Sequence, residues 1–142
     1  MERIEIDLSL FDNRRKEILE TILKAGNNNY RQALNELGII PLVTPKARFR
    51  LNPITCYQYV LGLDSFNRLQ QLLDNGQFYQ PGTGIIAVYY TDDLKPEKVN
   101  HLGKMKNKQE VVSKFGKLGL FQHNITDVPI IYGNRVTFIK EP

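Results

Sequence analysis

The chain has 142 residues, a length that suits one domain with a buried core. Hydrophobic residues make up 42% of it and charged residues 24%, which excludes a disordered or fibrous protein. No apolar run approaches the roughly eighteen residues of a membrane span. The charged start, Met1-Glu2-Arg3, differs from a signal peptide, so we expect a cytoplasmic protein or one exported by a specialised secretion system.

The net charge of +4 is concentrated in the last third of the chain. Residues 94–142 hold nine Lys or Arg against four Asp or Glu, whereas residues 1–93 hold ten against eleven. This imbalance favours an anionic partner such as nucleic acid, anionic lipid or a cell-wall polymer, although scattered lysines are also typical of a solvated surface. Of these we expect an anionic polymer rather than nucleic acid. Two histidines and one cysteine make a poor metal-ligand set, so we expect no metal and no cofactor.

The first forty residues predict a strand followed by two helices. Apolar and polar residues alternate over 4–10, which predicts a short strand with one buried face. A helix follows from the Asp-Asn pair at 12–13, with apolar residues at helical spacing, and Gly26 ends it. Residues 27–29 form a linker, and a second short helix covers 30–37.

The middle of the chain predicts an irregular segment and then two more helices. Three prolines mark the irregular or edge segment: Pro41, Pro45 and Pro53. Four apolar residues then share one helix face: Cys56, Tyr59, Val60 and Leu63. This helix begins near Asn52 or Thr55, which are both suitable caps. The next helix runs from Ser65 to Gly76 and buries Phe66.

The remainder predicts β structure. The segments 85–90, 99–105, 110–115 and 135–139 are strand candidates, and the short connections between them favour an antiparallel sheet. No linker divides the chain. We therefore predict one α+β domain over 1–142, with 1–49 as a helical lead-in and 50–142 carrying the cysteine helix and the sheet.

Cys56 is the only cysteine, and the pattern places it in the first turn of a helix. Unpaired backbone N–H groups there stabilise a thiolate, the nucleophilic form of cysteine, and also suit an oxyanion. The alternative is a packing role, because Cys56 lies on the apolar stripe of its helix. His101, at the start of a predicted strand, could hold the thiolate and later protonate a leaving group. A histidine with a purely structural role fits the same pattern.

These pieces together resemble the NlpC/P60 group of papain-like cysteine peptidases. The resemblance covers roughly residues 50–142. It rests on the helix-opening Cys56, on His101-Leu102-Gly103, on the strand Val111-Val112-Ser113 with Lys114-Phe115-Gly116, on His123, and on the ending Val128-Pro129-Ile130-Ile131-Tyr132-Gly133-Asn134 with Val136-Thr137-Phe138. The chain departs from the group at the nucleophile, where Thr55-Cys56-Tyr57 replaces the usual Asp-Cys-Ser-Gly or Asn-Cys.

The resemblance implies a papain-like α+β fold and cysteine-dependent cleavage of an amide bond in a peptide, peptidoglycan or protein substrate. Cys56 would be the nucleophile and His101 the general base and acid. Ser113 stands where the group carries its third polar residue, and His123 is the rival for orienting the imidazole. Tyr57 and Tyr89 would line the substrate groove.

Two alternatives to an active peptidase or amidase remain open at this stage. The chain could be a small basic binding domain in which Cys56 only packs in the core. It could also be an inactive descendant of the fold that binds without turnover, since a serine orients an imidazole only weakly. Thioester or other acyl chemistry on the same Cys–His pair is a variant of the enzymatic prediction.

Overall fold

The computed structural model describes residues 3–24, 26–42, 56–62, 64–115 and 118–141. Its elements in chain order are β1 (Ile6–Asp7), the 3-10 helix η1 (Leu8–Phe11), α1 (Asp12–Lys24), α2 (Gly26–Glu36), β2 (Ile40–Pro41), α4 (Cys56–Leu61), α5 (Ser65–Asp74), β3 (Ile86–Tyr90), η2 (Pro96–Lys98), β4 (Val99–Met105), β5 (Glu110–Lys114), β6 (Leu120–Asn124), η4 (Ile130–Tyr132) and β7 (Arg135–Ile139). Pro45, Pro53 and the predicted caps Asn52 and Thr55 lie outside the described residues.

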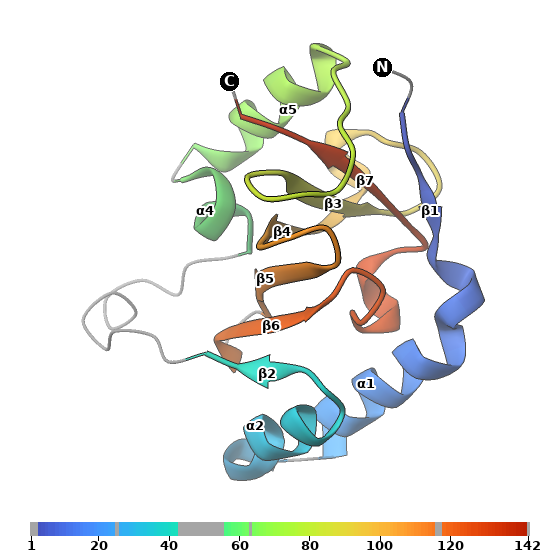
Figure 1. Cartoon of the computed structure of the whole chain (residues 1–142), viewed down its shortest axis with the longest axis vertical. Helices are drawn as coiled ribbons and strands as arrows, with labels where there is room; N and C mark the ends of the chain where they lie inside the picture. The colour runs from blue at the N-terminus through green and yellow to red at the C-terminus, as the bar shows by residue number, and fades with distance from the viewer. Residues whose placement is uncertain (1–2, 25, 43–55, 63, 116–117, 142) are drawn as a thin grey trace.

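One sheet organises the described residues. Its seven strands follow the order β1-β7-β3-β4-β5-β6-β2, and every pairing in it is antiparallel. β1 and β7, from opposite ends of the chain, lie side by side (Figure 1). The α+β class and the antiparallel sheet that the sequence predicts are confirmed.

Helices cover both faces of the sheet, because alternate residues of each strand point to opposite sides. We call one side the α1 face: α1, α2 and the segments beside them contribute Leu8, Ile18, Leu34 and Ile39 to a core with Ala87, Tyr89, Phe115, Phe121 and Phe138. We call the other side the α4 face: α4 and α5 contribute Val60, Leu61, Leu69 and Leu72 to a core with Ile86, Val88, Leu102 and Ile139. In Figure 1, α4 and α5 lie toward the upper left, and α1 and α2 at the bottom.

The end of α2 shows how a single glycine shapes the N-terminal region. Gly38 has a φ of 84°, a left-handed conformation that favours glycine. The N–H of Gly38 donates to the carbonyl of Asn35, and the N–H of Ile39 donates to that of Leu34. These two bonds form a Schellman motif, which ends the helix and turns the chain into the edge strand β2. The predicted edge position of Pro41 agrees with this.

The boundaries of the N-terminal elements differ from those predicted. Only Ile6 and Asp7 of the segment 4–10 pair as a strand; the 3-10 helix η1 follows at once, with the Asp7 side chain accepting the N–H of Ser9. The expected linker at 27–29 belongs instead to α2. An asparagine run favours caps and turns only weakly, and the helix that continues through Leu34 overrides it.

Two further differences concern β6 and Phe66. β6 was not predicted, because its buried face carries His123 beside Phe121, so the strand lacks a clear apolar alternation. Phe66 was predicted to be buried, but its side chain is 56% exposed. The prediction was wrong because the apolar stripe of α5 meets the sheet through Leu69 and Leu72. Among the described helices none is long and apolar enough to cross a membrane.

Candidate functional site

His101 lies in β4 on the α1 face, directly opposite Tyr89 of β3. Its ring is stacked on Tyr132 of η4, with centroids 4.4 Å apart and planes at 12°. The rings of Tyr89 and Phe115 complete the enclosure at 5.5 and 5.8 Å. Because only 1% of the residue is exposed, solvent does not reach the imidazole.

The two ring nitrogens of His101 are buried, and neither has a hydrogen-bond partner among the residues that the structure describes. Burial lowers the pKa of His101 well below its usual value, and the nearby charge that His123 would carry lowers it further. The imidazole is therefore neutral at pH 7. A neutral imidazole is the correct form for a general base, but this one is enclosed by the rings of Tyr89, Phe115 and Tyr132.

His123 and Ser113 form a hydrogen-bonded pair on the same face. Nε2 of His123 lies 2.7 Å from the Ser113 hydroxyl oxygen, and Nδ1 lies 2.7 Å from the carbonyl oxygen of Asn124. A carbonyl only accepts, so in the neutral ring Nδ1 carries the hydrogen and Nε2 accepts the Ser113 O–H. Burial lowers the pKa of His123 to about 4, against smaller opposing effects of the Asn124 carbonyl and Asp127.

Gly103 explains how Ser113 fits into this interior. It pairs with Ser113 across β4 and β5. A Cβ atom at Gly103 would lie 2.3 Å from the Val111 side chain and 2.5 Å from the Ser113 hydroxyl oxygen. The glycine two residues after His101 thus makes room for the Ser113 side chain. Neither Ser113 nor His123 bonds to a His101 ring nitrogen, so the predicted orienting contact is absent from the described residues.

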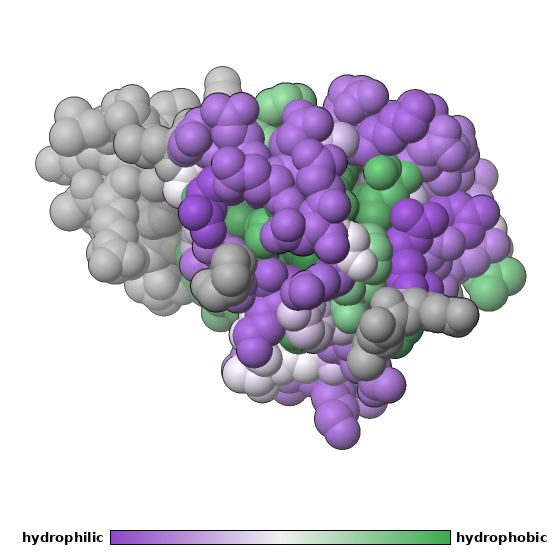
Figure 2. Space-filling view, turned by 90° about the horizontal axis from the view of Figure 1, so that it is seen from above, coloured by the Kyte–Doolittle hydropathy of each residue, from purple (hydrophilic) through white to green (hydrophobic). Residues whose placement is uncertain are grey.

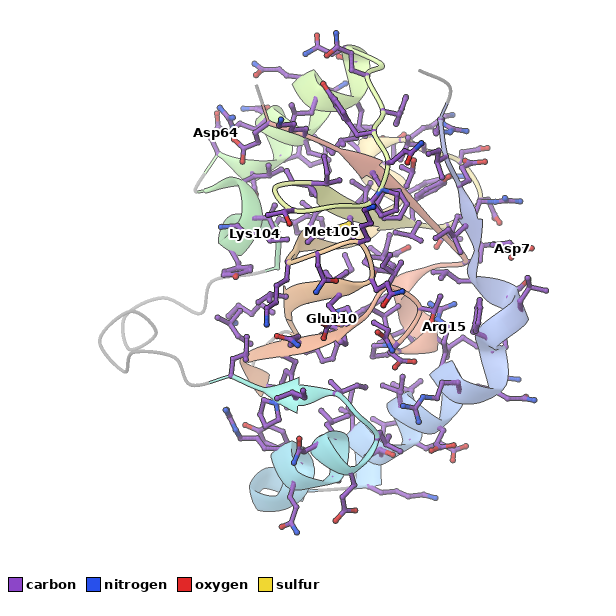
Figure 3. The ribbon with its side chains drawn as sticks, viewed as in Figure 1. Asp7, Arg15, Asp64, Lys104, Met105 and Glu110 are labelled. Carbon is purple, nitrogen blue, oxygen red and sulfur yellow. The ribbon has the colours of Figure 1, made fainter. Side chains whose placement is uncertain are left out.

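The helix that Cys56 opens lies on the other face of the sheet. Cys56 is the first residue of α4, as predicted; its side chain lies outside the described part. The Tyr57 hydroxyl donates to the Val99 carbonyl, and the Lys104 ammonium lies 4.8 Å from the centre of the Tyr59 ring. Figure 3 shows Lys104 on the α4 side of the sheet, whereas Arg15 lies on the side of α1.

The structure therefore brings together only part of the predicted site. His101, Ser113 and His123 share the α1 face, and these two histidines are all that the chain contains. The described part of α4, Cys56–Leu61, packs on the opposite face through Val60 and Leu61, so among the residues that the structure describes His101 and this helix lie on different sides of the sheet. The sheet itself, with the Leu102 side chain on the α4 side, separates the two.

The two predicted substrate-binding tyrosines have different positions. Tyr89 is fully buried and its hydroxyl donates to the Ile125 carbonyl at 2.6 Å, so it does not line a groove. Burial also raises the Tyr89 pKa far above its usual value. Tyr57 is half-buried and does border a cavity. The prediction for Tyr89 is corrected, because its strand neighbours and α1 face enclose it from all sides.

The cavity beside Tyr57 has a volume of about 230 Å³ and lies where α4, α5 and η2 meet. Its lining residues are Tyr57, Ser65, Phe66, Leu69, Pro96, Glu97 and Val99. Hydrophobic atoms show between hydrophilic ones on the upper side of the molecule (Figure 2). Sequence reasoning missed Glu97 and the exposed Phe66. The only signal for Phe66 is that it falls at the edge of the apolar stripe of its helix.

A second cavity of about 220 Å³ lies between α4 and the β3–β4 pair and is bordered by Val60, Met105, Lys104 and Glu141. Both of its charged residues have neighbours: Glu141 pairs with Arg68 at 2.5 Å, and Lys104 covers Tyr59. Within the part of the chain that the structure describes, no three His, Cys, Asp or Glu side chains gather as a metal site would require.

Comparison with models of protein families, with curated proteins and with solved structures gives no match. The resemblance to the NlpC/P60 group therefore stays a prediction from the residues quoted above.

Proposed function

We propose that this chain is a papain-like domain that binds a peptide-like ligand without cleaving it, the ligand seated in the cavity beside the start of α4. One observation supports this above the others: both histidines lie on the α1 face, whereas the helix of Cys56 packs on the α4 face. Cysteine-dependent hydrolysis needs a base that takes the thiol proton, and an imidazole on the other face of the sheet does not supply it.

The cavity gives this proposal a site. Tyr57 follows Cys56 directly and forms part of the cavity wall, where its hydroxyl is fixed to the Val99 carbonyl. About 230 Å³ is less than a drug-sized ligand needs and suits one side chain of a peptide. The ligand class comes from the resemblance, whose members act on peptide and cell-wall amides.

Amide-bond hydrolysis with Cys56 as nucleophile is the second candidate. It is favoured by the position of Cys56 as the first residue of α4, beside a cavity that could hold an acyl group. In that reaction His101 would have to accept the thiol proton, and the sulfur would attack the carbonyl carbon before water releases the acyl group.

Reaction of the folded protein with iodoacetamide between pH 5.5 and 8.5 distinguishes the two. If the chain only binds, His101→Phe leaves the dependence of the labelling rate on pH unchanged. An acidic midpoint, with a rate at pH 6 more than about tenfold that of a free thiol and lost in His101→Phe, would establish the Cys–His pair and overturn the proposal. Cys56→Ala gives the background.

A further inference from the structure

Resting on the proposed ligand cavity, we propose that its specificity is for an arginine side chain of a peptide. The walls of the cavity are aromatic and aliphatic: Tyr57 and Phe66 face Leu69, Pro96 and Val99. Glu97 supplies the single carboxylate among them. An aromatic surface beside a carboxylate recognises a planar cation through stacking and a charged hydrogen bond.

Phe66 is an exposed ring on the cavity lining. A phenylalanine in the first turn of α5 with 56% of its surface exposed contributes little to the core beneath it. Exposed rings are common on protein surfaces, but this one borders a cavity and has a tyrosine on the same lining. The ring of Tyr57 is held by its hydroxyl bond to Val99, so the wall opposite the ligand is fixed in advance.

The charge of the cavity lining comes from Glu97. Glu97 is exposed, and none of the ion pairs between described side chains includes it. The neighbouring base, Lys98, pairs with Asp93 at 3.5 Å. Among the described residues that line the cavity, Glu97 is the one charged side chain, in a chain that is basic as a whole.

The volume of the cavity suits one long side chain. A cavity of about 230 Å³ accommodates the three methylenes and the guanidinium of one arginine, with the methylenes against Leu69 and Val99. A lysine ammonium would reach Glu97 as well, but it lacks the flat surface that stacks on Phe66. Arginine is therefore preferred to lysine, and both are preferred to a neutral side chain.

The test uses the whole chain labelled with ¹⁵N and a five-residue probe, acetyl-Ala-Ala-Arg-Ala-Ala-amide, with matched peptides that carry citrulline or lysine in place of arginine. We expect amide shifts centred on Tyr57, Phe66 and Glu97. The citrulline peptide should bind about fivefold more weakly, the equivalent of one exposed ion pair. Glu97→Gln and Phe66→Ala should each weaken the arginine peptide by a similar factor.

Matched controls lie away from the cavity. Glu36→Gln changes an exposed carboxylate at the end of α2, and Phe11→Ala removes a partly exposed ring in η1; both should leave the affinity unchanged. Equal affinity for the arginine and citrulline peptides, or an unchanged affinity in Glu97→Gln, would overturn the arginine inference while leaving peptide binding in place. Shifts absent from the cavity with all three peptides would overturn the inference and the proposed binding function together.

Discussion

The two faces of the sheet use their buried residues differently. On the α1 face the core encloses Arg15, His101, Ser113 and His123 among aromatic rings. On the α4 face the helices meet the sheet through aliphatic side chains, and the cavity beside α4 opens there. The residue types that suggest catalysis are therefore structural groups of one face, while the cavity beside Tyr57 is on the other. Residue type and chain order indicated a single site; the face on which each strand residue lies separates its parts.

Among substitutions on the α1 face, we expect replacement of Arg15 to lower the free energy of unfolding most. Its guanidinium is 1% exposed and donates to the carbonyls of Val128, Pro129 and Gly133 at 3.1, 3.2 and 2.6 Å. Arg15→Met keeps the aliphatic stem but removes three buried hydrogen bonds; the Pro129 carbonyl keeps the N–H of Tyr132, whereas those of Val128 and Gly133 lose the donor that Arg15 supplies. The free energy of unfolding should therefore fall by about 3–5 kcal/mol. Urea denaturation measures this.

The control for Arg15 is its neighbour Arg14. Arg14 pairs with Asp127 at 3.3 Å from a side chain that is 35% exposed. Arg14 also donates to the Leu37 carbonyl, so Arg14→Met should cost about 1–2 kcal/mol, less than Arg15→Met. If the two substitutions cost the same, the buried guanidinium does not hold η4 against α1, and the stacking of Tyr132 on His101 needs another cause.

The second-largest loss of stability should come from lowering the pH, through the buried histidines of the α1 face. The unfolded chain takes up protons on its histidines near pH 6.5, whereas the folded pKa of His123 is about 4 and that of His101 is also lowered by burial. The unfolded state thus binds more protons in this range, and stability falls as the pH falls from about 6.5 toward 4. His123 alone accounts for about 3 kcal/mol. Urea titrations at pH 7 and pH 4 measure the loss.

Carboxylates take up protons in a lower pH range than the histidines, so their contribution to acid destabilisation can be told apart. The Asp7 pKa is lowered by its bonds to Ser9, and the Glu110 pKa by its bonds to Asn107 and Gln122, so the stability that these carboxylates contribute is lost at lower pH than that of the histidines. An equal free energy of unfolding at pH 7 and pH 4 would mean that the histidines are not buried in neutral form.

Ser113→Ala is expected to have an intermediate effect. It removes the donor to Nε2 of His123 and leaves that nitrogen buried without a partner, at a cost of about 1–3 kcal/mol. Thr83→Ala is the comparison: its hydroxyl donates to the Lys106 carbonyl at 3.0 Å in an exposed turn, where water replaces the bond, so the cost should stay below about 0.5 kcal/mol. Differential scanning calorimetry of both variants measures the contrast.

Periodicity predicted much of the fold from local sequence. β4 and β7 have the bounds that the sequence predicts, and Cys56 opens its helix as expected. These elements have regular apolar patterns and clear turn residues at their ends. β6 was missed because a buried histidine that bonds to Ser113 gives no apolar signal. A polar residue satisfied inside the core looks like a surface residue in the sequence.

The candidate site could be predicted only as a set of residues. The order Cys56, His101, Ser113, His123 does not tell on which face of the sheet each side chain lies. A shift of one residue in strand register would move every side chain of that strand to the other face. Register depends on long-range pairing, here Tyr89 with His101 and Gly103 with Ser113. Glu97 and Phe66 meet Tyr57 only because α4, α5 and η2 converge, which no local pattern predicts.

The smallest expected change in the free energy of unfolding is that of His101→Phe. It tests whether His101 has a packing role or a functional one. Its two unpartnered nitrogens each cost about 1–3 kcal/mol, and His101→Phe removes both while keeping a ring against Tyr132. The larger phenyl ring offsets part of this gain through crowding by Tyr89 and Phe115. We therefore expect a net stabilisation of about 1 kcal/mol by urea denaturation. A loss of more than about 2 kcal/mol would mean that the imidazole nitrogens have a partner in solution. If His101→Phe is more stable and binds the arginine peptide with unchanged affinity, His101 lowers the stability of the fold and does not contribute to ligand binding on the α4 face.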